Sequence, residues 1–162
     1  MQTNTVYKKL LAKIRIAIIF FTVALVLSGA TAFPLETELH WLLGFRNYMP
    51  DELAAFINRV YEALRDTNVH YPMLAYGYDW LAFAHLVIAL FFIGPLKDPI
   101  KNIWVIEWGM LACIAVIPLA FIAGPIRGIP LYWRLIDCSF GVFGIIPLYI
   151  VRRWIKQLEA MK

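Results

Sequence analysis

Long runs of hydrophobic residues, separated by shorter polar stretches, dominate the pattern along this chain. Four runs approach or exceed the ~20 residues that an α-helix needs to cross ~30 Å of hydrocarbon. They cover about residues 10–33, 78–94, 102–124 and 131–151. The pattern therefore predicts an all-α fold: an integral membrane four-helix bundle in a single four-span transmembrane domain, residues 1–162.

Two Gly-Pro pairs stand at the ends of the second and third runs. Glycine takes the left-handed cap conformation readily, and proline cannot continue the hydrogen-bond ladder of a helix. The sequence therefore predicts that Gly94-Pro95 and Gly124-Pro125 end these two helices.

The segment between the first two runs, residues 34–77, has a different pattern. Over about residues 50–66, apolar positions recur at helical spacing and charged or polar residues occupy the other face. Pro50 suits the first turn of a helix, and the acidic residues after it favour the positive end of the helix dipole. We expect an amphipathic helix in this long outer loop, lying on the membrane or capping the bundle.

Composition agrees with a membrane location. Hydrophobic residues make up 62% of the chain and its mean hydropathy is +0.69, so the apolar excess requires lipid in addition to a protein core. Basic residues gather on one side of the predicted bundle, at Lys8, Lys9, Lys13, Arg15, Lys97, Lys101, Arg152, Arg153, Lys156 and Lys162. The positive-inside rule makes that side cytoplasmic, which predicts a multi-pass protein of a cytoplasmic-type (inner) membrane with both termini in the cytoplasm. Because these basic residues flank apolar runs, we expect no nucleic-acid partner.

Ionisable side chains inside spans are costly and usually face the interior of a bundle or a cavity. This chain has five, of which four gather in the predicted outer half of the bilayer: Asp79, His85, Arg134 and Asp137. Glu107 stands apart, near the cytoplasmic face, where it is a possible relay site for protons.

The ligand-binding candidates are His85, Tyr78, Asp79, Arg134 and Asp137. If the second and fourth spans face each other, Asp137 or Tyr78 can hydrogen-bond His85 and set its charge. The small residues of segment 28–30 lie at similar depth, where they either permit close helix packing or leave space for a ligand.

Each candidate also has a purely structural interpretation. Arg134 and Asp137 are three residues apart and can form an internal ion pair that secures the fourth span. Asp79 and Glu107 lie near the interfaces, where they can pair with Arg127 and Lys101 respectively. His85 itself can be a hydrogen-bonded packing residue.

No motif for a catalytic nucleophile, a nucleotide or a metal is visible, so we assign no catalytic and no metal residues. A b-type haem needs two facing histidines, and His85 is the one histidine inside a span. We expect no cofactor, with haem b and a quinone as the open alternatives. The two cysteines lie in apolar runs and are expected to remain free thiols.

Three segments carry a resemblance to a family of uncharacterised bacterial four-span membrane proteins, which implies a topology but no activity. They are AFPLETEL, RDTNVHYPMLAYGYDWLAFAH and IAGPIRGIPLYWRLIDCSFG. The chain also resembles, more distantly, the four-span EXPERA group of sterol isomerases and a sterol-responsive receptor. That resemblance rests on the order Pro50, Glu52, Tyr61, Asp66, Trp80 and His85. It implies a ligand cavity, with His85 where that group has a carboxylate; the absence of an ionisable residue in 16–33 departs from the group.

Three functions remain open from the sequence. The first is binding of an apolar ligand (a lipid, sterol-like molecule or quinone) in an outer-half cavity around His85. The second is a structural or assembly subunit with a membrane-protein partner or in a homo-oligomer. The third is an oligomeric proton-coupled transporter or channel, in which His85 and Glu107 act as successive relay sites.

Overall fold

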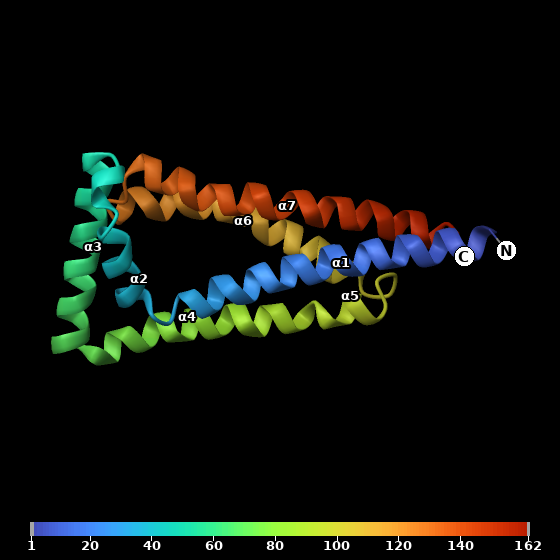
Figure 1. Ribbon diagram of the computed structural model, residues 1–162, viewed down its shortest axis with the longest axis horizontal. Helices are drawn as coiled ribbons and strands as arrows, with labels where there is room; N and C mark the ends of the chain where they lie inside the picture. The colour runs from blue at the N-terminus through green and yellow to red at the C-terminus, as the bar shows by residue number, and fades with distance from the viewer. Residues whose placement is uncertain (1, 162) are drawn as a thin grey trace. The chain divides into compact units, whose positions relative to one another are not determined.

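The computed structural model describes residues 2–161, and within them the chain forms helices and no strand. The four apolar runs correspond to α1 (Gln2–Thr31), α4 (Pro72–Phe91), α6 (Ile103–Ile126) and α7 (Leu131–Glu159). The remaining helices are α2 (Leu35–Leu43), the 3-10 turn η1 (Arg46–Tyr48), α3 (Asp51–His70) and α5 (Ile93–Lys97) (Figure 1).

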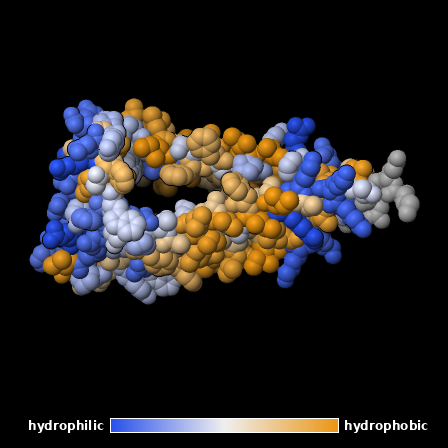
Figure 2. All heavy atoms as spheres, in the orientation of Figure 1, coloured by the Kyte–Doolittle hydropathy of each residue, from blue (hydrophilic) through white to orange (hydrophobic). Residues whose placement is uncertain are grey.

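Four helical segments are long and apolar enough to cross a membrane: Thr5–Thr31, Pro72–Lys97, Ile103–Ile126 and Leu131–Glu159. Large apolar side chains remain exposed along them, including Phe20, Leu119 and Phe143. Figure 2 shows this hydrophobic surface over the long helices and hydrophilic residues over α3. A surface of this kind is stable in lipid rather than in water, so the fold is consistent with a multi-pass integral membrane protein. The prediction of an all-helical chain with four spanning-length apolar helices is confirmed.

The two Gly-Pro pairs lie near helix ends but do not form the caps that the sequence predicts. Gly94 and Pro95 lie inside α5, where proline is tolerated because the first turn of a helix has no intrahelical partner for its N–H. Gly124 and Pro125 belong to the last turn of α6. The helix ends at Ile126. Gly128, two residues later, is left-handed with a φ of 67°, and the N–H of Ile129 donates to the carbonyl of Gly124 at 2.9 Å.

The chain divides into two compact units. Unit 1 comprises the described residues of Met1–Val23 and Leu90–Lys162, and unit 2 comprises Ala24–Ala89. α1 and α4 therefore contribute to both units.

The core of unit 1 is aliphatic. Its fully buried side chains are Ile14, Ile18, Ile106, Leu148, Val151, Ile155 and Leu158. The Nε of Arg15 donates to the carbonyl of Leu96 at 3.0 Å, which links the middle of α1 to the end of α5. The amide of Asn102 donates to the carbonyls of Gly94 and Asp98, at 3.1 and 2.9 Å, and so closes the turn before α6.

Glycines allow α6 and α7 to approach each other closely within unit 1. A Cβ added to Gly141 would collide with the carbonyl oxygen of Cys113, and one added to Gly144 would lie 3.0 Å from the Sγ of Cys113. At the other end of the pair, Gly109 faces Leu148. Small residues at such crossings let two helices pack backbone against backbone, a common arrangement in membranes. Cys113 and Cys138 are both free thiols, as the sequence predicts.

In unit 2, α2 and α3 pack against each other, with Leu39 and Ile57 as their buried apolar side chains. α3 begins after Pro50, whose carbonyl accepts the first helical hydrogen bond from Ala54 at 3.0 Å, and it continues to His70. The segment predicted as a helix over about 50–66 is thus helical for a further turn.

Candidate functional site

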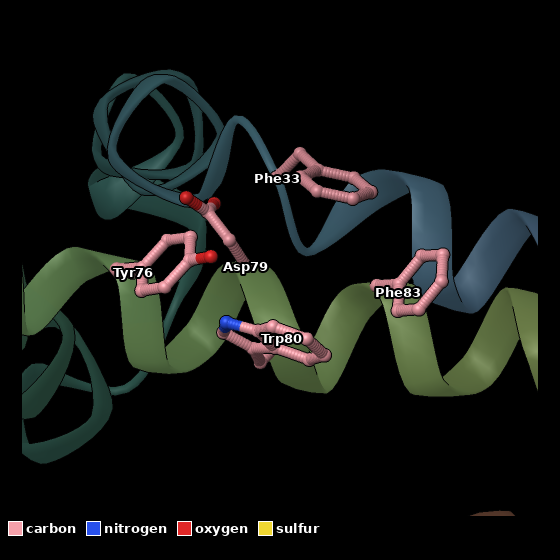
Figure 3. Close-up of a pocket in the computed structure, with 5 residues that line it drawn as sticks. All are labelled: Phe33, Tyr76, Asp79, Trp80 and Phe83. Atoms are coloured by element: carbon pink, nitrogen blue, oxygen red, sulfur yellow. The ribbon is translucent and has the colours of Figure 1, made fainter.

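An open pocket of about 310 Å³ lies in unit 2, beside the first half of α4 (Figure 3). Four aromatic side chains and one carboxylate line it: Phe33, Tyr76, Asp79, Trp80 and Phe83. Its volume is at the small end of the range for ligand pockets, which suits a headgroup or a short stretch of chain.

The sequence spacing of α4 places four of these residues on one face. Tyr76, Asp79, Trp80 and Phe83 follow the i, i+3, i+4, i+7 pattern, so their side chains project from the same side of the helix. Phe33 comes from the turn after α1, and Figure 3 shows it facing the side of α4 that carries Asp79. The pocket therefore depends on contact between the end of α1 and α4.

The aromatic rings on α4 pack edge to face. The ring centroids of Tyr76 and Trp80 are 5.8 Å apart, and those of Trp80 and Phe83 are 5.9 Å apart, both pairs being nearly perpendicular. Perpendicular packing is a favoured arrangement for aromatic pairs because the positive edge of one ring meets the negative face of the next. It holds three rings in a fixed row along the pocket.

Asp79 is half-buried and is the charged member of the lining. Within residues 2–161 it makes no hydrogen bond and no ion pair; the ion pairs there are His70–Asp66, Arg152–Glu107 and Lys156–Glu159. Partial burial of an unpaired carboxylate is costly, so this position is suited to attract a cation.

His85 is held by its own helix and lies outside the residues that line the pocket. Its Nδ1 donates to the carbonyl of Leu81 at 2.8 Å. Because a carbonyl oxygen only accepts, this hydrogen bond requires a hydrogen on Nδ1. The Cβ of His85 faces Gly29, so of the two roles expected for the small residues of 28–30, close helix packing is the one observed at Gly29.

Tyr78 bonds to α3 and not to His85. Its hydroxyl donates to Oδ1 of Asn68 at 2.8 Å, and Nδ2 of Asn68 donates to Oε2 of Glu36 at 2.5 Å. This chain of hydrogen bonds connects α4, α3 and α2 in unit 2. Of the two partners considered for His85, Tyr78 is thus engaged elsewhere, and His85 bonds within its own helix.

Arg134 and Asp137 belong to unit 1, whereas His85, Tyr78 and Asp79 belong to unit 2. The aliphatic part of Arg134 lies on Gly124, where any Cβ would collide with its Cγ and Cδ, and its guanidinium is 5.8 Å from the centre of the Phe121 ring. Its Nε is buried without a hydrogen-bond partner in the described chain. The internal ion pair expected between Arg134 and Asp137 does not form among these residues.

Glu107 is held by an ion pair between helices. Oε1 of Glu107 accepts a hydrogen bond from Nε of Arg152 at 2.8 Å, which links α6 to α7. Both side chains are about two-fifths exposed. The sequence analysis considered Lys101 as the partner of Glu107, but the observed partner is Arg152 in α7.

The other two histidines have local partners. The His40 ring lies 5.7 Å from the Tyr61 ring, and Nδ1 of His70 lies 3.0 Å from the carboxylate of Asp66. Across residues 2–161, no three His, Cys, Asp or Glu side chains form a group that could hold a metal ion.

Sequence reasoning found Asp79 but missed the aromatic lining of its pocket. Tyr76 and Trp80 fit the aromatic residues expected at a membrane interface, so they carried no separate signal for a ligand. Their spacing with Asp79 and Phe83 on one helical face was the available signal. Glu36 in α2 and Asn68 in α3 are polar residues that belong to no motif, and nothing in the sequence marked them as partners of Tyr78.

Comparison with family models, with curated proteins and with solved structures found no match. The fold and the site therefore define only a class of protein. It is all-helical, with four helices of membrane-spanning length and a pocket lined by aromatic residues and one acidic residue.

Proposed function

We propose that this protein binds a membrane lipid or a similar apolar ligand in the pocket of unit 2. The observation that carries the proposal is the aromatic row on α4 with Asp79 beside it and Phe33 opposite. Apolar pockets with a few polar groups are the usual form of small-molecule sites, and lipid is the most abundant apolar molecule around a membrane helix. Sterol-like molecules and quinones share this chemistry and remain within the proposal.

The position of the pocket suits a lipid. Asp79 is seven residues from the start of α4, roughly 10 Å along the helix, so the lining lies near one end of a candidate span. Aromatic side chains with a polar group are typical of the boundary between headgroups and hydrocarbon. A ligand there would place its polar end at Asp79 and extend its chains along the apolar face of α4.

The proposed orientation follows from the basic residues. We place both termini and the Arg152 end of α7 in the cytoplasm of a cell with an inner-type membrane, because Lys and Arg concentrate on that side. The pocket and α3 would then face the opposite compartment.

His85 has a supporting role in this proposal. It is two residues beyond Phe83, and its contact with Gly29 brings α1 and α4 together where Phe33 faces the pocket. A His85→Ala variant should therefore weaken ligand retention less than loss of the lining rings. Equal loss in both variants would instead place His85 in direct contact with the ligand.

The test is native mass spectrometry of protein purified in a mild detergent. We expect one lipid-sized adduct per chain in the wild type and its loss in a Trp80→Leu and Phe83→Leu double variant. A matched control, Trp41→Leu with Phe45→Leu, removes two exposed rings of unit 2 that do not line the pocket and should keep the adduct. A wild type without any stoichiometric adduct, or a double variant that binds normally, would contradict the proposal.

A structural or assembly subunit is the second candidate. The observation that favours it is that the charged side chains of unit 1 serve helix packing: Arg152 pairs with Glu107, and Arg134 covers Gly124. A fixed membrane-protein partner that copurifies with the wild type, in place of a lipid adduct, would support this function.

A further inference from the structure

We propose that the ligand of the Asp79 pocket carries an ammonium group at its polar end, as in a lipid with a choline or ethanolamine headgroup. This inference rests on the proposed function and specifies the chemistry of its ligand. It follows from the single charge of the lining and from the row of aromatic rings beside it.

The charge of the pocket selects for a cation. Asp79 is half-buried in the lining and has no ion-pair or hydrogen-bond partner among the described residues of unit 2. None of the five residues that line the pocket is basic, so nothing there compensates a negative headgroup. A bound ammonium group supplies the missing counter-charge, whereas an anionic group beside Asp79 would be repelled. In choline and ethanolamine lipids the ammonium is the terminal group, so it can reach Asp79 while the phosphate stays outside the pocket.

The aromatic rings select for the same group by a second mechanism. A ring carries negative charge density on its face, and a cation within about 6 Å of the ring centre is attracted to it, most strongly for tryptophan. Trp80 stands between Tyr76 and Phe83, and its perpendicular contacts fix the directions of all three rings. Quaternary ammonium groups are typical ligands of aromatic cages because they lack N–H donors and depend on ring faces.

These two mechanisms predict different sensitivities for two headgroups. An ethanolamine ammonium has three N–H donors and gains most from the carboxylate of Asp79. A choline ammonium is methylated and gains relatively more from the ring of Trp80. Loss of the carboxylate should therefore weaken both lipids, and loss of the indole should weaken the choline lipid more.

The experiment is native mass spectrometry of the full-length protein, titrated with dimyristoyl lipids that differ only in headgroup: phosphatidylcholine, phosphatidylethanolamine and phosphatidylglycerol. The protein has a formal charge of +4, so basic residues elsewhere will take up some anionic lipid. The measured quantity is therefore the change in affinity between the wild type and Asp79→Asn for each lipid. We expect a decrease of about three- to thirtyfold for the two ammonium lipids and none for phosphatidylglycerol.

Matched variants separate the two mechanisms from general damage. Trp80→Leu should lower phosphatidylcholine affinity about three- to thirtyfold and phosphatidylethanolamine affinity less. Asp66→Asn and Trp41→Leu make the same chemical changes at exposed positions of unit 2 outside the pocket, and both should bind all three lipids as the wild type does. Thermal unfolding of every variant in the same detergent identifies any that does not fold.

The outcomes distinguish the inference from the function on which it rests. Lipid binding at the pocket that is equal for all three headgroups, and unchanged by Asp79→Asn, would overturn the ammonium inference but leave lipid binding intact. No pocket-dependent binding of any lipid would overturn both. Trp80→Leu changes the pocket at a second position. If Asp79→Asn fails to fold, the loss of phosphatidylcholine affinity relative to phosphatidylethanolamine between the wild type and Trp80→Leu still tests the inference.

Discussion

In unit 2, the Cβ of His85 occupies the space that a side chain on Gly29 would need. A Cβ added to Gly29 would approach it to 2.7 Å and would lie 3.0 Å from the carbonyl oxygen of Ala82. α1 and α4 therefore meet with no side chain on the α1 side of the contact. This contact fixes the distance between the two helices just beyond the aromatic pocket.

The Gly29 contact predicts that Gly29→Ala destabilises the protein. The added methyl group meets a Cβ and a backbone oxygen, neither of which can rotate away, so we expect a loss of about 1–3 kcal/mol. Gly77→Ala is the matched control, because Gly77 is also helical but has open space around its Cβ position, and it should stabilise by about 0.5–1 kcal/mol. Unfolding of both variants in mixed micelles measures the difference. Stabilisation by both alanines would show that the two helices separate freely.

The Tyr78–Asn68–Glu36 chain predicts a non-additive effect. Tyr78→Phe removes one hydrogen bond and should lower the free energy of unfolding by about 1 kcal/mol. Asn68→Ala removes both bonds and leaves two polar groups unpaired, so it should cost about 2–3 kcal/mol. The double variant should cost no more than Asn68→Ala alone, since Tyr78 has then already lost its partner. Additive losses in the double-mutant cycle would mean that the Tyr78–Asn68 hydrogen bond contributes no stability.

The Arg152–Glu107 pair predicts that the protein is least stable when one of the two charges is removed and the other remains. Glu107→Gln should lower stability by about 1 kcal/mol, and adding Arg152→Gln should recover part of that loss because no unpaired charge then remains. Lys156 and Glu159 provide the control, since they form a more exposed pair within one helix, and Glu159→Gln should change stability by less than about 0.5 kcal/mol. Thermal unfolding at low and high salt measures the stability of the Glu107 variants and of the Glu159→Gln control. A double variant less stable than either single variant would contradict this interpretation.

The position of Arg134 predicts that its hydrocarbon stem matters more than its charge. Arg134→Met keeps the contact with Gly124 and removes a buried, unsatisfied N–H, so its stability should stay within about 1 kcal/mol of the wild type. Arg134→Ala removes the stem and should cost about 1–2 kcal/mol. Arg127→Met, at an exposed residue after α6, tests the general effect of losing a cation. If Arg134→Met were the more damaging substitution, the guanidinium would have a partner such as Asp137 after all.

The sequence predicted the long helices well because their signal is strong and local. A run of apolar residues of spanning length has few other stable structures in lipid, since a helix satisfies its own backbone hydrogen bonds. Helix ends were predicted less well. The sequence predicts that Gly124 and Pro125 end α6, but the helix continues to Ile126 and the left-handed glycine after it is Gly128.

The contacts between helices depend on which face of each helix packs against its neighbour, and the sequence alone does not give this. His85 and Tyr78 share one helical stripe, yet one bonds back to Leu81 and the other to α3. Glu107 and Arg152 are far apart along the chain, and either could have paired with several other charged residues. The Asp79 pocket needed the position of Phe33, which lies in a turn whose direction follows from no local pattern.

The close packing of α6 and α7 also bears on the order in which the protein is made. Residues 127–130 join the two helices. Glycines allow close contact between them from Gly109, near the start of α6, to Gly124, near its end. During synthesis α6 is made before α7, so its glycines stay uncovered until α7 has been inserted beside it. A chain truncated before Leu131 would expose that surface permanently, and such a fragment should be degraded rather than accumulate.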